Sequence, residues 1–493
     1  MDRYPRARPR PGAVPLSSSS RLETDLLGDR RVPAEAYYGI HTLRALENFP
    51  ISGIPISAFP DLICALACVK QAAARTNREL GLLDARRAEA IEGACGEIRE
   101  GLLHDQFVVD IIQGGAGTST NMNANEVIAN RGLELLGHRR GEYLHLHPIE
   151  HVNMSQSTND VYPTALKVGL QLSIGRLAAA MASLRAAFEE KAAEFEDVLK
   201  MGRTQLQDAV PMTLGQEFGA FAVTLKEDEE RLGEASRLMR EINLGATAVG
   251  TGINTPPEYA GLACRHLAEI TGMDLVTSPH LVEATQDAGA FVQLSGVLKR
   301  VAVKLSKTCN DLRLLSSGPR AGLAEISLPA RQAGSTIMPG KVNPVIPEVV
   351  NQVAFEVIGH DVAVSFAAEA GQLQLNAFEP LIAASLFGSL SHLRNACLTL
   401  EANCVRGITA DRRRMRRTVE DSVGLATALN PYIGYERASA VAREAYETGE
   451  SVYSLVLTKG WLSAEQLAAI LTPEGLTAPR PVPPAAGPAP GQE

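Results

Sequence analysis

Apolar side chains recur along much of the chain at spacings of three, four and seven residues, which line one face of an α-helix. The longest such stretch begins at Pro163 and carries Leu166, Leu170, Leu177, Met181, Leu184 and Phe188. Alanine fills many positions between them, and alanine loses no side-chain entropy in a helix. Similar patterns cover residues 214–242, 288–315, 347–370 and 380–404. The pattern predicts five long helices without strands between them, packed as a bundle.

The long helices carry apolar residues on more than one face, so they must bury them against a further surface. A bundle of this size commonly finds that surface in another copy of itself, which predicts an oligomer. The flanking segments differ in pattern and give five parts. These are a leader without fold (1–20), an N-terminal domain (21–159), a central helical-bundle domain (160–406), a small C-terminal helical domain (407–472) and a flexible tail rich in Pro, Ala and Gly (473–493).

Composition narrows the functional classes. The formal net charge of −9 argues against a nucleic-acid partner, and no apolar run reaches the roughly 18 residues that would span a membrane. The 7 cysteines include no Cys-x-x-Cys pair and read as buried thiols in a reducing compartment. The basic N-terminal stretch lacks the apolar core of a secretory signal. We therefore expect a cytoplasmic protein without membrane or nucleic-acid partners.

Four segments rich in Gly, Ser, Thr and Asn lie at or near predicted helix ends: residues 114–126, 155–160, 202–208 and 334–343. Orphan backbone N–H groups and the positive end of the helix dipole favour an anion at a helix start. One such cluster alone is more often a set of N-caps than a binding site. Four of them, one with a lysine, favour a site for a small polyanion.

The segment AGSTIMPGKVNPVIPE, residues 333–348, resembles a phosphate-binding loop in composition. It lacks the required spacing, because five residues separate Gly334 from Gly340 and Val342 occupies the place of the magnesium-binding hydroxyl. Pro339 also removes a backbone donor. A nucleotide site is therefore disfavoured.

Two further clusters have plainer interpretations. The run HLHPIEH contains His145, His147 and His151, but it has neither paired cysteines nor His-Glu-x-x-His spacing, and it reads as a polar loop. The run RRRMRR, residues 412–417, is surrounded by acidic residues and reads as a solvated helix face. No Gly-x-Ser-x-Gly elbow is present, which leaves a hydrolase triad without its sequence signal.

The loop GSTIMPGKVNP, residues 334–344, closely resembles the signature of the aspartase/fumarase superfamily, Gly-Ser-Ser-x-Met-Pro-x-Lys-x-Asn, with Thr336 in place of the second serine. The segments GAGTSTNMNANEV, HVNMSQSTNDVYPTA, KMGRTQLQDAVPMTLGQEF and LQLNAFEP also resemble family segments in order, and the resemblance covers residues 21–471. It implies a mainly α, three-domain fold. The central bundle would assemble into a 20-helix core in a homotetramer, with active sites shared by three subunits.

The resemblance also implies roles for individual residues. Ser335 would be the general base, acting as an alkoxide on a mobile lid formed by residues 334–343. The resemblance implies a dicarboxylate substrate, with one carboxylate bound by Lys341 and Asn343, and the carboxylate where charge develops placed near Thr204 and Gln205. The residues expected around the amino group are Thr118, Ser157, Thr158 and Asn159. Thr336 would be a further binding residue and Glu348 a supporting residue. No cofactor or catalytic metal is implied, and a divalent cation such as Mg²⁺ would serve only as an activator.

Two reactions of the family remain in play. One is the elimination of ammonia from L-aspartate through an aci-carboxylate intermediate, and the other is the hydration of fumarate by class II fumarases. Gln205 favours the first, because fumarases resemble Gly-Arg-Thr-His where this chain has GRTQ. The stretch at residues 21–49 also resembles aspartases more than fumarases. A catalytically silent scaffold is the alternative from another class, since fold alone does not prove function; the retained polar set, Ser335 and Lys341 included, speaks against it.

Overall fold

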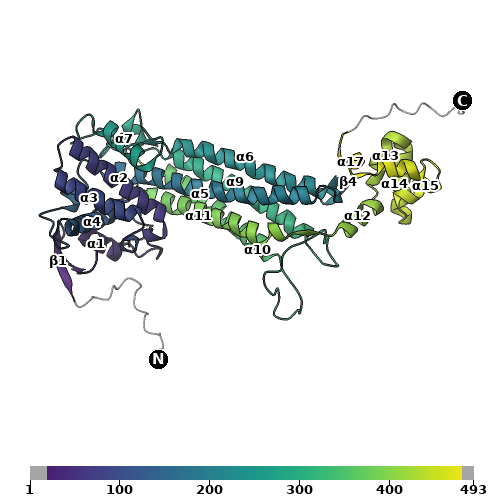
Figure 1. Ribbon diagram of the computed structural model, residues 1–493, viewed down its shortest axis with the longest axis horizontal. Coiled ribbons are helices and arrows are strands. Elements are labelled where there is room, and N and C mark those ends of the chain that lie inside the picture. The colour runs from purple at the N-terminus through teal and green to yellow at the C-terminus, as the bar shows by residue number, and fades with distance from the viewer. Residues whose placement is uncertain (1–18, 480–493) are drawn as a thin grey trace. The chain divides into compact units, whose positions relative to one another are not determined.

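The computed structural model of the chain describes residues 19–479 and is mainly helical (Figure 1). Contacts divide the described residues into two compact units: unit 1 contains residues 19–178, 230–302 and 355–394, and unit 2 contains residues 179–229, 303–354 and 395–479. The predicted leader lies outside the described residues except for Ser19 and Ser20. The predicted tail begins with a short helix, α17 (Pro473–Thr477), and its residues 480–493 lie outside the description.

The N-terminal part of unit 1 joins a β-hairpin to a group of helices. Strands β1 (Ser20–Asp25) and β2 (Gly28–Pro33) pair antiparallel from Ser20 opposite Pro33 to Asp25 opposite Gly28. The elements that follow are α1 (Ile40–Asn48), η1 (Ile56–Ala58), α2 (Pro60–Glu79), α3 (Ala85–Arg99), η2 (His104–Gln106), α4 (Thr118–Leu135) and the π-helix η3 (Pro148–Val152). Helix α2 is buried along most of its length and is rich in alanine, which allows close helix packing.

A buried carboxylate holds the start of α1. Glu126 on α4 accepts hydrogen bonds from the backbone N–H groups of Gly39 at 2.8 Å, His41 at 2.8 Å and Thr42 at 3.1 Å. The side chain of Glu126 thus satisfies donors that a helix start leaves unpaired. Gly39 leaves room for this contact, because a Cβ there would lie 2.7 Å from the Glu23 carboxylate and 2.8 Å from that of Glu126.

Replacing Gly39 with alanine is therefore expected to lower the free energy of unfolding by about 2 kcal/mol, the usual cost of overpacking a filled site. Gly96→Ala is the matched control, because a Cβ at that helical position meets no atom within 4 Å. Gly96→Ala should raise the free energy of unfolding by about 0.5–1 kcal/mol, because glycine inside a helix is less stable than alanine by that amount. Urea unfolding of both variants measures the difference, and equal stability of the two would contradict the packing argument.

The five predicted long helices are all present: α5 (Thr158–Glu194), α6 (Leu214–Leu238), α9 (Gly289–Leu315), α10 (Val345–Glu369) and α11 (Glu379–Asn403). Two details of the prediction are wrong. Helix α6 ends at Leu238, and Ile242 belongs to β5 (Glu241–Ile242), which pairs in parallel with β6 (Val276–Thr277). Short elements also separate the long helices, namely β3 (Leu199–Thr204), β4 (Gln207–Thr213), α7 (Tyr259–Thr271), α8 (Leu281–Ala284) and β7 (Ile326–Ser327). Two-residue strands leave too few residues for alternation to reveal them.

Helix α5 contains Pro163 in its second turn. Proline has no N–H, so the carbonyl of Asn159, four residues earlier, lacks its helical donor. The side-chain amide of Asn243 donates to that carbonyl at 3.1 Å instead. The start of α5 is therefore held by a residue that follows β5.

Unit 2 contains the β3–β4 hairpin and the C-terminal helices. The short strand β7 pairs with β8 (Thr409–Ala410), which follows η4 (Val405–Gly407). The later helices are α12 (Arg412–Asp421), α13 (Leu425–Ile433), α14 (Tyr435–Thr448), α15 (Val452–Thr458) and α16 (Ala464–Ile470), and they share one hydrophobic cluster with Met201 of β3. The division of the chain into N-terminal, central and C-terminal domains remains a prediction.

The predictions for the arginine run and for the cysteines can be compared with the structure. The arginine run lies on α12, where Arg416 pairs with Glu420 and Arg417 with Asp421 on an exposed face, as predicted. All seven cysteines are free thiols, and six of them are buried. Among residues 19–479, no helix is both long and apolar enough to cross a membrane.

Candidate functional site

Thr118 is the first residue of α4, as the polar segment predicted for a helix start. The preceding residues Gly115, Ala116 and Gly117 all have positive φ angles, of 89°, 55° and 90°. Gly117 also lies against the ring of Tyr162, since a Cβ there would approach that ring to 2.5 Å. The Thr118 hydroxyl donates to the Gly115 carbonyl at 2.8 Å and remains exposed. This turn presents the oxygen of Thr118 at the surface of unit 1.

Thr158 is the first residue of α5, and its hydroxyl is linked to α4. The Asn121 side-chain amide donates to the Thr158 hydroxyl oxygen at 3.1 Å. Since Asn121 lies one turn after Thr118, the two predicted segments meet in unit 1. Asn159 uses its side-chain amide to donate to the Ala248 carbonyl at 2.7 Å, and its backbone N–H donates to the Ser157 hydroxyl at 3.3 Å. Ser157, Thr158 and Asn159 thus belong to a polar network at the start of α5 that is linked to α4 through Asn121, whereas the Thr118 hydroxyl bonds to Gly115.

A fully buried carboxylate orders the same network. One oxygen of Asp160 accepts from the backbone N–H of Ser157 at 3.0 Å, and the other accepts from those of Gly245 at 3.1 Å and Thr247 at 2.9 Å. Burial raises the pKa of Asp160 to about 6, although the three N–H donors act in the opposite direction. Asp160 is therefore a carboxylate at neutral pH that ties the start of α5 to the loop after β5.

Lys70, fully buried on α2, supports the turn that precedes α5. Its ammonium donates to Asn153 Oδ1 and to Gln156 Oε1, both at 2.9 Å. The amides of Asn121 and Asn125 donate to the same oxygen of Asn153 at 3.1 Å each. Burial lowers the pKa of Lys70 to about 7, partly offset by the charge of Asp160.

This lowered pKa predicts a pH dependence of stability. Between about pH 7 and 10 the unfolded chain binds a proton at Lys70 that the folded chain does not, so stability rises with pH and is lost as pH falls toward 7. The free energy of unfolding should rise by about 1.4 kcal/mol per pH unit in this range because of Lys70. Lys70→Met should lose this slope, measured by urea unfolding from pH 7 to 10. Lys307→Met, at an exposed lysine, is the matched control, and an unchanged slope in Lys70→Met would contradict the assignment.

Ser335 lies in an irregular loop of unit 2 between β7 and α10. Its hydroxyl oxygen accepts hydrogen bonds from the backbone N–H of Met338 at 2.9 Å and of Ile337 at 3.2 Å. Such donors favour a negatively charged oxygen over a neutral hydroxyl. The two N–H donors therefore suit an ionised oxygen at Ser335.

The base of this loop is closed by hydrogen bonds between its ends. The N–H of Gly334 donates to the Lys341 carbonyl at 2.7 Å, and the side-chain amide of Asn343 donates to the Gly334 carbonyl at 2.8 Å. The loop borders a cavity of about 700 Å³ lined by Lys341 and Asn343 together with Arg313, Ser316 and Ser317. Asn343 thus shapes the loop in addition to facing this cavity. Thr336 is exposed on the loop, and Glu348 lies in the first turn of α10.

Thr204 and Gln205 do not lie at a helix start, which corrects the expectation for residues 202–208. They form the turn of the β3–β4 hairpin, where Thr204 pairs with Gln207 and the central residues Gln205 and Leu206 have φ angles of 53° and 64°. This two-residue turn requires left-handed backbone at both positions, which normally selects Asn or Gly. The absence of glycine hid the hairpin from sequence reasoning.

Ion pairs to Glu325 hold strand β3 of the hairpin. The buried carboxylate of Glu325 lies 2.6 Å from Arg203 and 3.1 Å from Lys200, both on β3. Glu325 immediately precedes β7, ten residues before Ser335 along the chain. Within residues 19–479, no hydrogen bond or ion pair joins the hairpin turn to the Ser335 loop itself.

The predicted site residues therefore form separate groups. One group lies in unit 1 and the hairpin and Ser335 groups lie in unit 2. Sequence reasoning missed Lys70, Asp160 and the loop at residues 245–254. A signal existed for each: a lone lysine inside an apolar helix, an aspartate at a helix start, and the run GATAVGTGIN with its Gly and Thr residues.

Two histidines of the HLHPIEH run, His147 and His151, are used for local structure. His147 Nδ1 accepts from the N–H groups of Ile149 and Glu150 at the start of η3, and His151 Nδ1 accepts from the His147 N–H at 2.8 Å. These bonds engage Nδ1 of His147 and Nδ1 of His151 within the local fold.

Two family models match this chain, and several named proteins are similar to it over most of its length. A family model described as lyase matches residues 28–359, and one described as the fumarase C C-terminus matches residues 425–478. The aspartate ammonia-lyase of Pseudomonas fluorescens is 61% identical over 468 residues, which is 95% of this chain and 98% of that protein. The aspartate ammonia-lyase of Escherichia coli strain K12 is 55% identical over 465 residues, which is 94% of this chain and 97% of that protein.

Solved structures are similar over nearly the whole fold. The cobalt-bound fumarate lyase:delta crystallin from Brucella melitensis has a TM-score of 0.90 and 56% identity, and the match covers 92% of this chain and 99% of that one. The class II fumarase from Schistosoma mansoni has a TM-score of 0.87 at only 34% identity, with 92% and 98% covered.

Proposed function

The chain belongs to the lyase family of the aspartate ammonia-lyases and is a carbon–nitrogen lyase, and from this premise we propose that it catalyses the reversible anti-elimination of ammonia from L-aspartate to give fumarate. The observation that carries the proposal is the position of Ser335. Its hydroxyl oxygen faces two backbone N–H donors on a loop that also carries a lysine.

Ser335 is the proposed general base. Its oxygen, as an alkoxide, takes a proton from the carbon of L-aspartate next to the side-chain carboxylate, and the electron pair moves into that carboxylate to give an aci-carboxylate. The pair then returns, the bond from carbon to nitrogen breaks, and ammonia leaves with formation of fumarate. The N–H groups of Ile337 and Met338 support the ionised serine.

Neutral oxygens in unit 1 are proposed to receive the amino group. Thr118, Ser157, Thr158 and Asn159 supply hydroxyl and amide oxygens that accept hydrogen bonds from an ammonium without a fixed charge that would retain it. The side-chain amide of Asn159 is engaged with Ala248, which leaves its oxygen for the substrate. Asp160 is buried and accepts a hydrogen bond from the Ser157 N–H, so it acts as a positioning residue for the segment at the start of α5.

Lys341 and Asn343 are proposed to bind one substrate carboxylate from the 700 Å³ cavity, and Thr204 and Gln205 to lie near the other. Gln205 donates hydrogen bonds but carries no acidic proton at neutral pH, so it stabilises charge without acid catalysis. Thr336 is assigned to the substrate and Glu348 to support of the loop. No cofactor is required by this scheme, and a divalent cation such as Mg²⁺ would act only as an activator.

The loop at residues 334–343 is proposed to act as a lid. Its apolar tip is exposed, with Ile337 at 84% of its full accessibility and Met338 and Val342 also exposed. Apolar side chains at a loop tip gain by covering a bound ligand or a neighbouring surface. Closure would bring Ser335 to the substrate and exclude water.

A homotetramer with sites shared by three subunits is proposed from the surface of α10. Phe355, Val362 and Phe366 are spaced by seven and four residues and are exposed by 62%, 52% and 70%. Their spacing places them on one face of the helix. A stripe of this kind is typical of an interface, and it suits the 20-helix core that the family resemblance implies.

Phe366→Glu is expected to lower the assembly state, because a charge would be buried in the interface. Light scattering should give the mass of four 52.6 kDa chains for wild type and a smaller mass for the variant. Tyr446→Glu, at an exposed aromatic residue of α14, is the control. A monomeric wild type would contradict the proposed tetramer.

The function is tested by following fumarate absorbance with L-aspartate and L-malate offered separately. We expect fumarate from L-aspartate and little from L-malate. The reverse result would identify a class II fumarase activity, the alternative on this scaffold. Silence with both substrates from a folded oligomer would contradict the proposal.

A further inference from the structure

The loop between α4 and η3, residues 136–147, brings together two histidines and a glutamate that the proposed reaction does not use. One ligand atom each from His138, Glu142 and His145 lies within 4.8 Å of the other two. His138 Nδ1 is 3.7 Å from Glu142 Oε2. The imidazole rings of His138 and His145 stack with centroids 3.7 Å apart and an interplanar angle of 6°.

The backbone of this loop is fixed before any ligand arrives. The His138 N–H donates to the Leu133 carbonyl at 2.9 Å, at the end of α4, and the His145 N–H donates to the Glu142 carbonyl at 3.0 Å. The Arg87 guanidinium donates to the His145 carbonyl at 2.7 Å. Each of the three side chains therefore projects from an anchored position, which lowers the entropy lost on binding.

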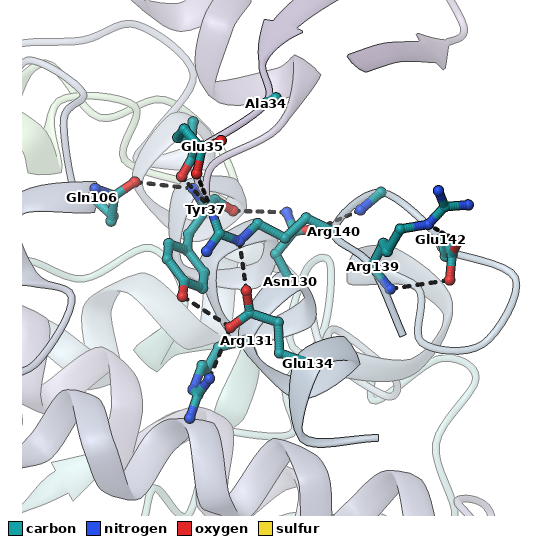
Figure 2. A network of polar contacts seen from close by, with 12 residues as sticks. Ala34, Glu35, Tyr37, Gln106, Asn130, Arg131, Glu134, Arg139, Arg140 and Glu142 are labelled. Carbon is teal, nitrogen blue, oxygen red and sulfur yellow. Dashed lines mark hydrogen bonds and ion pairs between the residues drawn. The ribbon is translucent and has the colours of Figure 1, made fainter. Parts of the chain in front are cut away.

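The competing partner of Glu142 is weak. Glu142 Oε1 accepts from Arg139 Nε at 2.8 Å and Oε2 accepts from the Arg139 N–H at 3.1 Å, the two contacts drawn between these residues in Figure 2. The Arg139 side chain is 90% exposed, so solvent screening weakens its ion pair with Glu142. Oε2 thus retains a lone pair on the side of His138.

Two imidazole nitrogens and one carboxylate oxygen are the donors that Zn²⁺ prefers. We propose that His138, Glu142 and His145 form a binding site for a divalent transition-metal cation of the zinc type. Bonds of about 2.0–2.2 Å require ligand atoms roughly 3.3–3.5 Å apart, so ligand atoms that now lie within 4.8 Å of one another must move closer together. The two imidazole rings must also turn out of their stack, because each nitrogen lone pair lies in the plane of its ring.

A surface hollow of about 600 Å³ lies beside the cluster and is lined by His138 and Glu142 together with Arg139, Arg140 and Glu134. Water from this hollow would complete the coordination, as in sites with three protein ligands. The bound cation would join the end of α4 to His145, two residues before the histidine that caps η3. Its effect is to stabilise the folded chain by binding it in preference to the unfolded one.

The test uses the full-length protein after treatment with a chelator. Titration calorimetry with Zn²⁺ should give one site per chain, and Zn²⁺ should raise the Tm. His145→Ala, at an exposed residue, and Glu142→Gln should each weaken binding at least tenfold and reduce the Tm shift. His280→Ala, an exposed histidine outside the cluster, is the matched control and should bind Zn²⁺ as wild type does.

Competition with Mg²⁺ distinguishes a nitrogen-donor site from an acidic surface, because Mg²⁺ prefers oxygen ligands. An equal concentration of Mg²⁺ should leave the Zn²⁺ affinity unchanged. Three results would overturn the proposal: no Zn²⁺ binding by wild type, wild-type affinity in His145→Ala, or displacement of Zn²⁺ by equimolar Mg²⁺. Circular dichroism of each variant establishes that the fold is retained.

Discussion

Ser335→Ala is expected to lower kcat/KM for L-aspartate by about 10²–10⁴-fold, the usual contribution of a positioned general base. The methyl group cannot accept a proton, and the N–H groups of Ile337 and Met338 lose the oxygen that they now face. The loop is exposed, so the loss of the hydroxyl should leave the free energy of unfolding within about 0.5 kcal/mol of wild type. Fumarate absorbance measures the rate.

Ser327→Ala is the control for this change, because Ser327 is an exposed serine that lines the same cavity but lies outside the loop. It should retain wild-type kcat. If Ser335→Ala raises KM but leaves kcat unchanged, Ser335 binds substrate without taking the proton. In that case another residue must be the base.

Asp160→Asn is expected to lower the free energy of unfolding by about 3 kcal/mol and to reduce kcat/KM as well. The two carboxylate oxygens together accept three backbone N–H groups, from Ser157, Gly245 and Thr247. In asparagine one oxygen becomes an NH₂ group, so at least one buried N–H faces a donor, at a cost of about 1–3 kcal/mol. The other bonds lose their charge assistance, and Lys70 loses a nearby negative charge.

Asp274→Asn is the matched control, because Asp274 is exposed and pairs with Arg240 at the surface. Its effect on stability should stay below about 1 kcal/mol. Urea unfolding at pH 7 compares the two variants, and the rate with L-aspartate is measured on the folded fraction. An Asp160→Asn protein as stable as Asp274→Asn would mean that the three N–H groups find other acceptors.

The long helices could be predicted because each repeats its apolar pattern over many turns, so one turn that departs from the pattern does not hide the helix. Helices α9, α10 and α11 agree with the prediction to within two residues at each end, whereas α5 begins at Thr158, before the predicted start at Pro163. The β3–β4 hairpin could not be predicted in this way, because Gln205 and Leu206 adopt left-handed backbone without glycine. Tertiary contacts, such as the Glu325 ion pairs with β3, overcome the local cost.

The candidate site was partly predictable for a similar reason. Thr118 and Ser335 stand in runs of small polar residues that differ from the apolar helices around them, and resemblance to a family gave them roles. Lys70 and Asp160 act through burial, and burial depends on packing between segments distant in sequence. Their partners, Asn153 and Gly245 among them, could be identified only from the folded chain.

Pro163 has a consequence for the opening motions of the protein. Because the Asn159 carbonyl is satisfied by Asn243 and not by the helix itself, the first turn of α5 and the chain after β5 cannot open independently of each other. The N–H groups of Gly245 and Thr247, both bonded to Asp160, should therefore exchange with deuterium at the same rate as that of Ser157. The proline thus makes the first turn of α5 and the chain after β5 a single cooperative unit, so Ser157, Thr158 and Asn159 lose their fixed positions together when this unit opens.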